Sequence, residues 1–78
     1  MYYHFRYKVI NTVPRTDSDL SFLQDLDVTD RDLDFWLRPR HVGGSVEVMV
    51  KPEAQLDFIK SLTERGMKYE IMMTDVQE

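Results

Sequence analysis

The sequence predicts an α+β open sandwich, in which a four-stranded antiparallel sheet carries two helices on one face. Two observations lead to this class. The 78 residues are enough for one small domain and no more. Their hydrophobic patterns follow the order strand, helix, strand, strand, helix, strand, without repeats or linkers. Right-handed crossovers then place the first and third strands in the centre, in the order 4-1-3-2.

A predicted hairpin in the middle of the chain is the clearest of these patterns. Its strands, Leu33–Leu37 and Ser45–Val50, alternate between apolar and polar residues, as half-buried strands do. Segment 38–44 between them carries turn residues without periodicity and is expected to be a loop. Trp36 falls on the face opposite the core. The hairpin residues expected in the core are Leu33, Phe35, Leu37, Val46, Val48 and Val50.

The first strand and the first helix precede the hairpin. Tyr3–Val13 alternates, and its odd-numbered side is the more apolar, so we expect that side to be buried. Pro14 ends the strand because it lacks a ladder donor. A helix from Asp17 to Leu26 follows, capped by Thr16 or Asp17. Its apolar stripe consists of Leu20, Phe22, Leu23 and Leu26.

The second helix and the last strand follow the hairpin. Lys51-Pro52-Glu53 opens the helix, with proline in the first turn, and Gly66 is expected to close it in a left-handed conformation. Alternation of Tyr69, Ile71 and Met73 predicts the last strand. The complete order corresponds to the ferredoxin-like arrangement. The residues expected on the buried side of the helix are Ala54, Leu56, Phe58, Ile59 and Leu62.

Helices on one face leave the other face of the sheet open. Trp36 allows two interpretations there: it belongs to a partner site, or it folds over its neighbours and is half-buried. The residues predicted on the open face are His4, Arg6, Lys8, Ile10, Trp36, Glu47, Met49 and Met72.

Composition and motifs argue against several classes of function. The net charge of −4 disfavours a nucleic-acid partner, although Arg38 and Arg40 form a local basic patch. No apolar run reaches the ~18 residues of a membrane span, and no leader precedes the first strand, so we expect a cytosolic chain or a fragment without its leader. The chain has no cysteine, and His4 and His41 lack metal spacing. We therefore predict no catalytic residues, no metal and no cofactor.

Two other functions are known for proteins of this topology. A module for single-stranded RNA stacks bases on aromatic residues of its central strands, but Ser45, Glu47 and Met49 offer no such platform. A phosphatase of the acylphosphatase kind needs a phosphate-cradling loop after the first strand. That loop is Pro14-Arg15-Thr16, with one arginine and no glycine. The RNA-binding module remains the alternative prediction.

Several stretches of the chain resemble the activation domain of metallocarboxypeptidase zymogens. They are the Leu-Asp-Phe-Trp stretch at 33–36 with the loop after it, segment 46–52, and segment 66–77 with its Tyr-Glu-Ile-Met and Asp-Val-Gln. Segments 9–14 and 19–26 fit the first strand and the first helix of that family. The resemblance therefore covers nearly the whole chain.

The resemblance implies a propeptide, not an enzyme. Such a propeptide precedes a zinc carboxypeptidase, assists its folding and caps its active-site cleft until proteolysis releases it. It implies a secreted protein whose partner is the carboxypeptidase catalytic domain, and an isolated domain that is monomeric, with no nucleic-acid or membrane partner. The residues implied to contact the enzyme are Trp36, Leu37, Arg38, Pro39, Arg40, His41, Val42 and Gly43.

The chain departs from the family pattern in two respects. Prosegments of the carboxypeptidase B type place an aspartate in the hairpin loop, whereas residues 37–44 contain two arginines and no acid. The resemblance is therefore closer to the carboxypeptidase A type. The family also continues into a connecting helix, so we expect residues 1–78 to be one globular prosegment domain truncated before that helix, and to inhibit more weakly than a full prosegment.

Overall fold

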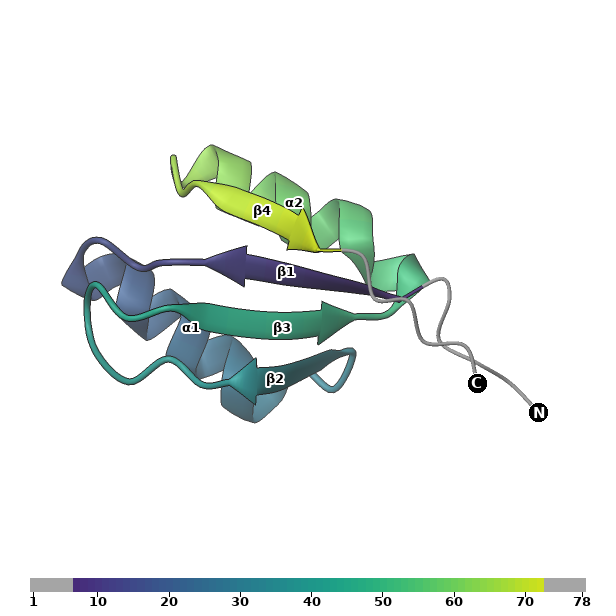
Figure 1. Ribbon diagram of the computed structural model, residues 1–78, viewed down its shortest axis with the longest axis horizontal. Helices are drawn as coiled ribbons and strands as arrows, with labels where there is room; N and C mark the ends of the chain where they lie inside the picture. The colour runs from purple at the N-terminus through teal and green to yellow at the C-terminus, as the bar shows by residue number, and fades with distance from the viewer. Residues whose placement is uncertain (1–6, 73–78) are drawn as a thin grey trace.

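The computed structural model describes residues 7–72 of the chain. Figure 1 shows the order of the elements predicted from the hydrophobic patterns, with a short turn of 3₁₀ helix before the second α-helix. The elements are β1 (Lys8–Thr12), α1 (Asp17–Thr29), β2 (Leu33–Leu37), β3 (Val46–Val50), the 3₁₀ turn η1 (Pro52–Ala54), α2 (Gln55–Glu64) and β4 (Tyr69–Met72).

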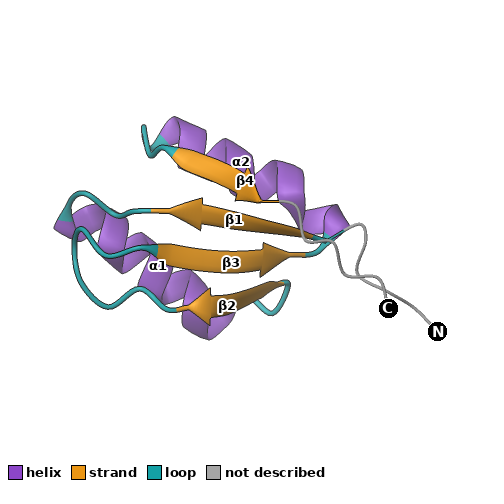
Figure 2. Cartoon of the chain, viewed as in Figure 1, coloured by secondary structure: helices purple, strands orange, loops and turns teal. Residues whose placement is uncertain are grey.

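The four strands form one sheet in the order β2-β3-β1-β4, and every neighbouring pair is antiparallel. This is the predicted order 4-1-3-2 counted from the opposite edge. Both helices lie on the same side of the sheet in Figure 2, so its other face is left open. The predicted α+β fold of ferredoxin-like topology is confirmed.

The core lies between the sheet and the two helices. Strand β3 is central, and its Val46, Val48 and Val50 have no exposed surface. Apolar burial of this kind contributes about 25 cal/mol per Å², and it is the main term that holds so small a domain together. The core cluster consists of Ile10, Leu23, Leu33, Phe35, Val46, Val48, Val50, Phe58, Leu62 and Met67.

The predicted facing of β1 was wrong. Ile10 and Thr12 lie opposite Val48 and Val46 of β3, and residues directly opposite in an antiparallel pair share a face. The even-numbered side therefore faces the helices. Val9 is also buried, with an exposed fraction of 2%, but it lies opposite Met49 on the other face.

The set of residues on the open face therefore differs from the predicted set. Lys8 and Ile10 were predicted there and lie instead on the helix-covered side. Glu47, Met49 and Met72 lie on the open face as predicted, opposite Asn11 and Val9 of β1. His4 and Arg6, the remaining predicted members on this strand, lie outside the described residues.

Helix α1 begins where the sequence predicts and ends three residues later. The Thr16 side chain accepts a hydrogen bond from the Asp19 amide at 3.0 Å, and the Asp19 carboxylate accepts one from the Arg15 amide at 3.3 Å. The first bond satisfies an amide that the first turn leaves free, and the second ties Asp19 back to the residue before the cap. The helix continues past Leu26 to Thr29.

Helix α2 begins after η1 and buries Phe58 and Leu62, which are four residues apart. Leu56 was predicted on the same side, but it is 81% exposed. It lies two residues, or about 200° of helical rotation, before Phe58, so it faces solvent. Its prediction as a core residue was wrong.

The end of α2 follows the prediction for Gly66. This residue has φ +73°, and its amide donates to the Thr63 carbonyl at 3.0 Å. The Met67 amide donates to the Leu62 carbonyl at 2.9 Å. This pair of bonds is a Schellman motif, which turns the chain back so that the Met67 side chain packs into the core.

Strand β2 contains an irregularity that redirects Leu37. The pairing with β3 shifts between Phe35 and Leu37, so Leu37 lies opposite Glu47, a residue of the open face. Leu37 is 44% exposed. The prediction that it belongs to the core was wrong, because a bulge changes the alternation that the sequence pattern assumes.

Candidate functional site

The indole of Trp36 lies on the open side of β2, as the sequence predicts. It is 51% exposed, and its Nε1 donates to the Asp34 carboxylate at 3.2 Å. The preceding residue, Phe35, is buried in the core. Because neighbouring side chains of a strand point to opposite faces, burial of Phe35 keeps the indole outside.

Two further apolar side chains are exposed close to Trp36 in the sequence. The bulge turns Leu37 outward, and Val42 in the loop after β2 is 41% exposed. Exposed apolar side chains on one hairpin of a small domain are candidates for a partner site. We call Trp36, Leu37 and Val42 the apolar patch.

The loop between β2 and β3, residues 38–45, is fastened to the rest of the domain. The Gly43 amide donates to the Pro14 carbonyl at 2.8 Å, and Gln24 Nε2 of α1 donates to the Pro39 carbonyl at 3.2 Å. Pro39 is itself buried. The loop is therefore held at two points by parts of the chain that lie far from it in sequence.

The tip of the loop is a tight turn built on glycine. The Gly44 amide donates to the His41 carbonyl at 3.1 Å, and Gly43 has φ +90°. A Cβ on Gly44 would stand 2.8 Å from Cε1 of the His41 ring, so a side chain at this position would require the exposed ring to move. Arg40, His41 and Val42 are thereby presented to solvent in a defined shape.

The implied contact residues thus fall into two groups. Those whose side chains or backbone are exposed are Trp36, Leu37, Arg38, Arg40, His41, Val42 and Gly43, whereas Pro39 is buried against the domain. Arg38 is exposed but lies 3.9 Å from Asp27 of α1. An ion pair of this kind is worth little energetically, about 0–1 kcal/mol, yet it biases the side chain toward α1.

The described residues contain no cluster of possible metal ligands. Among residues 7–72, no three His, Cys, Asp or Glu side chains come together as metal ligands would. His41 is exposed, and its Nδ1 lies 3.3 Å from the Val42 carbonyl. In the same part of the chain, no helix is both long and apolar enough to cross a membrane.

The open face also lacks the platform that RNA-binding modules of this topology use. The central strands β1 and β3 present Val9, Asn11, Glu47 and Met49 there, with no aromatic ring for a base to stack on. Trp36 belongs to the edge strand β2. The alternative prediction of an RNA-binding module therefore gains no support from the described residues.

The fold and surface define a small α+β domain with an open sheet face, whose β2 and braced loop expose the apolar side chains of Trp36, Leu37 and Val42. A family model described as the carboxypeptidase activation peptide matches residues 10–78 of the chain. The chain belongs to this family. It is therefore a propeptide domain of the metallocarboxypeptidase zymogens, a class that is not itself catalytic and that associates with a carboxypeptidase catalytic domain.

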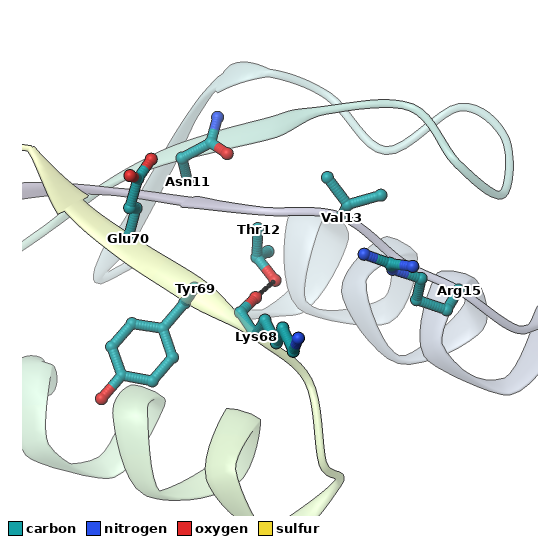
Figure 3. Close-up of a pocket in the computed structure, with 7 residues that line it drawn as sticks. All are labelled: Asn11, Thr12, Val13, Arg15, Lys68, Tyr69 and Glu70. Atoms are coloured by element: carbon teal, nitrogen blue, oxygen red, sulfur yellow. Dashed lines mark hydrogen bonds between the residues drawn. The ribbon is translucent and has the colours of Figure 1, made fainter.

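The sequence analysis did not identify two charged residues at the end of the sheet where β1 ends and β4 begins. Arg15 and Lys68 line an open depression of about 180 Å³ at the end of β1 and the start of β4, together with Thr12 and Tyr69 (Figure 3). They are far apart in the sequence. No spacing rule connects them, and only the strand order could have indicated their proximity.

Proposed function

We propose that this domain assists the folding of a zinc carboxypeptidase and blocks the entrance to its active-site cleft, with Trp36 and residues 37–43 as the contact surface. The observation that carries the proposal is the half-exposed Trp36 indole, next in sequence to the exposed Leu37, at the base of a loop that is held by hydrogen bonds and carries the exposed Val42. The mechanism is steric: the hairpin occupies the place of the substrate residues upstream of the cleaved bond.

Preorganisation supports this mechanism. A mobile loop loses conformational freedom on binding, at a cost of about 0.5–1.5 kcal/mol for each flexible side chain that becomes fixed. Here the Gly43–Pro14 and Gln24–Pro39 hydrogen bonds hold the loop before any partner arrives. In this proposal the buried Pro39 supports the loop from below, and its exposed neighbours contact the enzyme.

The charge of the loop supports an inhibitor closer to the carboxypeptidase A type. A B-type prosegment pairs a loop carboxylate with the arginine that binds the substrate carboxylate. Residues 37–44 contain no Asp or Glu, so this loop offers no such ion pair. Inhibition then depends on shape and on burial of the apolar patch, and zymogens of this kind are secreted.

Folding assistance follows from the same surface. A catalytic domain that folds against the propeptide gains the contact free energy only in its native arrangement, so the complex favours that arrangement. Refolding a denatured zinc carboxypeptidase with and without the 78-residue chain measures this activity. The recovery of active enzyme should rise with the chain present, and an unchanged recovery contradicts this part of the proposal.

Replacement of Trp36 by alanine tests the contact surface directly. Central tryptophans of an interface commonly contribute about 2 kcal/mol or more, which corresponds to a rise of roughly 30-fold in the inhibition constant. The measurement is a titration of wild-type and Trp36→Ala chains against mature zinc carboxypeptidases of the A and B types. The melting temperature should change little, because the indole is half-exposed.

Leu56→Ala provides a matched control, because Leu56 is another exposed apolar side chain but belongs to the helix layer. It should leave inhibition unchanged. The proposal fails if Trp36→Ala inhibits as well as the wild type, or if both variants weaken inhibition equally. Stronger inhibition of B-type than of A-type enzymes would contradict the assignment of type.

A further inference from the structure

One end of the sheet brings together three connections that are far apart in the sequence. They are residues 13–16 between β1 and α1, residues 38–45 between β2 and β3, and residues 65–68 between α2 and β4 (Figure 1). None of the three contains an Asp or Glu. Together they carry five cationic side chains, those of Arg15, Arg38, Arg40, Arg65 and Lys68.

Hydrogen bonds between the connections make this end continuous. The Gly43 amide binds the carbonyl of Pro14, which immediately precedes Arg15. On the other side, the Thr12 hydroxyl donates to the Lys68 carbonyl at 2.7 Å (Figure 3). The loop tip with Arg40, the start of α1 with Arg15 and the start of β4 with Lys68 therefore form successive parts of one rim.

The five cations differ in how far they are already neutralised. Arg38 lies 3.9 Å from Asp27, and Arg65 lies 3.5 Å from Asp19 while its guanidinium also stands 4.5 Å from the Phe22 ring centre. Within residues 7–72, the ion pairs do not include the other three. We call these three, Arg15, Arg40 and Lys68, the basic arc.

The basic arc stands out against the charge of the whole chain. The chain carries a net charge of −4, so these cations are concentrated on an otherwise acidic molecule. Glu70 is the acidic residue that lines the same depression as Arg15 and Lys68. Such an asymmetric distribution orients a protein in the field of a charged partner and raises the rate of productive encounter.

We propose that the basic arc docks against an acidic rim around the active-site cleft of the carboxypeptidase catalytic domain, and that it steers the domain into place. This inference rests on the proposed function, because the hairpin determines which end of the sheet meets the enzyme. It adds Arg15 and Lys68, which lie outside the hairpin, to the interaction surface. The apolar patch then holds the complex, whereas the basic arc speeds its formation.

A sulfated polysaccharide is a poorer occupant than an acidic protein rim. A long polyanion extends beyond the cations of this rim onto the rest of a chain whose net charge is −4, whereas an acidic protein rim can be confined to the contact. The basic arc is also contiguous with the loop that carries Val42 of the apolar patch. Mixed apolar and cationic surfaces of this kind are typical of protein interfaces.

The experiment measures association and dissociation rates of the 78-residue chain on immobilised mature zinc carboxypeptidases with acidic or basic cleft rims, over a range of ionic strength. The test variant is Arg15→Ser with Lys68→Ser. Arg31→Ser with Lys60→Ser is the matched control, because it removes the same charge from exposed positions at the opposite end and on α2. Melting temperatures of both variants exclude unfolding.

On an enzyme with an acidic rim, the test variant should associate about tenfold more slowly at low ionic strength, with a difference that shrinks as salt is added. Its dissociation rate should change less than about twofold, since steering acts mainly on association. Glu70→Gln should raise the association rate. The control pair should change the rates little, and enzymes with basic rims should associate slowly with the wild type.

Three results overturn the proposal. An equal effect of the control pair would show that net charge matters and position does not. A normal association rate of the test variant, with Trp36→Ala still defective, would show that the basic arc has no role in association, while the proposed function would stand. Retention of the wild type, but not of the test variant, on a heparin column at about 0.15 M salt, with unchanged enzyme binding, would assign the arc to a polyanion. Absence of binding by the wild type to every enzyme would overturn the proposed function itself.

Discussion

Two adjacent residues of β2 have different roles: one stabilises the core, and the other is exposed on the surface. Phe35 is 8% exposed and belongs to the core cluster, whereas Trp36 is 51% exposed on the other face. Both are large aromatic residues, so residue type alone does not distinguish their roles. The alternation of the strand does, and the two side chains can therefore be tested independently.

Phe35→Ala should destabilise the domain severely. Removal of a buried phenylalanine costs about 3–5 kcal/mol, because a cavity remains where the ring was. A core of this size supplies only about 3–5 kcal/mol of net stability, so the variant should be largely unfolded at room temperature. Circular dichroism during thermal unfolding measures this effect, and a melting temperature near that of the wild type would contradict the placement of Phe35 in the core.

Leu37→Ala should have little effect on stability, although the apolar pattern of β2 suggests otherwise. The side chain is 44% exposed and lies opposite Glu47, so little apolar surface returns to water when it is shortened. We expect a loss of less than about 1 kcal/mol in chemical denaturation. A loss of 2 kcal/mol or more, typical of a buried leucine, would show that the bulge does not turn this side chain outward.

At the scale of the element, the two helices depend on local hydrogen bonds at their ends. Thr16 caps α1, and the Schellman motif at Gly66 ends α2 and directs Met67 into the core. Both features can be predicted from the sequence, because capping depends on residues within one turn of the helix end. These two capped ends are predicted correctly, whereas the end of α1 at Thr29 and the exposure of Leu56 are not.

Thr16→Ala should lower the free energy of unfolding by about 1 kcal/mol, because the Asp19 amide loses its acceptor. Ser21→Ala is the control, since Ser21 is exposed within α1 and alanine is a better helix former. It should be neutral or slightly stabilising. Equal losses in urea denaturation of the two variants would mean that the cap contributes nothing of its own.

Gly66→Ala should cost about 1–2 kcal/mol, since its φ of +73° is unfavourable for a residue with a Cβ. No atom lies within 4 Å of the Cβ position, so the loss is a property of the backbone and not of a clash. Gly66→Asn should recover part of it, because asparagine tolerates this conformation. A melting temperature of Gly66→Asn below that of Gly66→Ala would contradict this explanation.

At the scale of the whole molecule, the central strands of the sheet are more deeply buried than the edge strand β4. The central strands β1 and β3 lie between neighbours and carry fully buried residues such as Ile10 and Val48. Strand β4 lies at an edge, and its Tyr69 and Ile71 are 37% and 42% exposed. The layer of helices thus covers the edge of the sheet less completely than its centre.

Amide hydrogen exchange should reproduce this gradient. The amides of Ile10 and Val48 are expected to exchange only through global unfolding, whereas those amides of β4 that donate to β1 should exchange about tenfold faster or more through local opening of the edge strand. Nuclear magnetic resonance of the 78-residue chain resolves these amides individually. Uniform protection across the four strands would show that the edge does not open by itself.

The predictions made from sequence were most accurate where a local pattern was sufficient. The strands of the hairpin, the caps of the helices and the outward position of Trp36 all depend on residues within a few positions of one another. The prediction for β1 was wrong because each side of the strand carries one aliphatic residue, Val9 or Ile10, so the pattern does not select a face. Its face is determined by the opposition of Ile10 to Val48, which is a contact between distant segments.

The sequence by itself determined the order of the elements, and through right-handed crossovers the order of the strands, because periodicity and capping are properties of short stretches of chain. Only the tertiary structure decided which side of β1 is buried, where Leu37 points, and that Arg15, Arg40 and Lys68 share one rim. These features depend on strand register and on hydrogen bonds between connections, and neither leaves a trace in the spacing of residues along the chain.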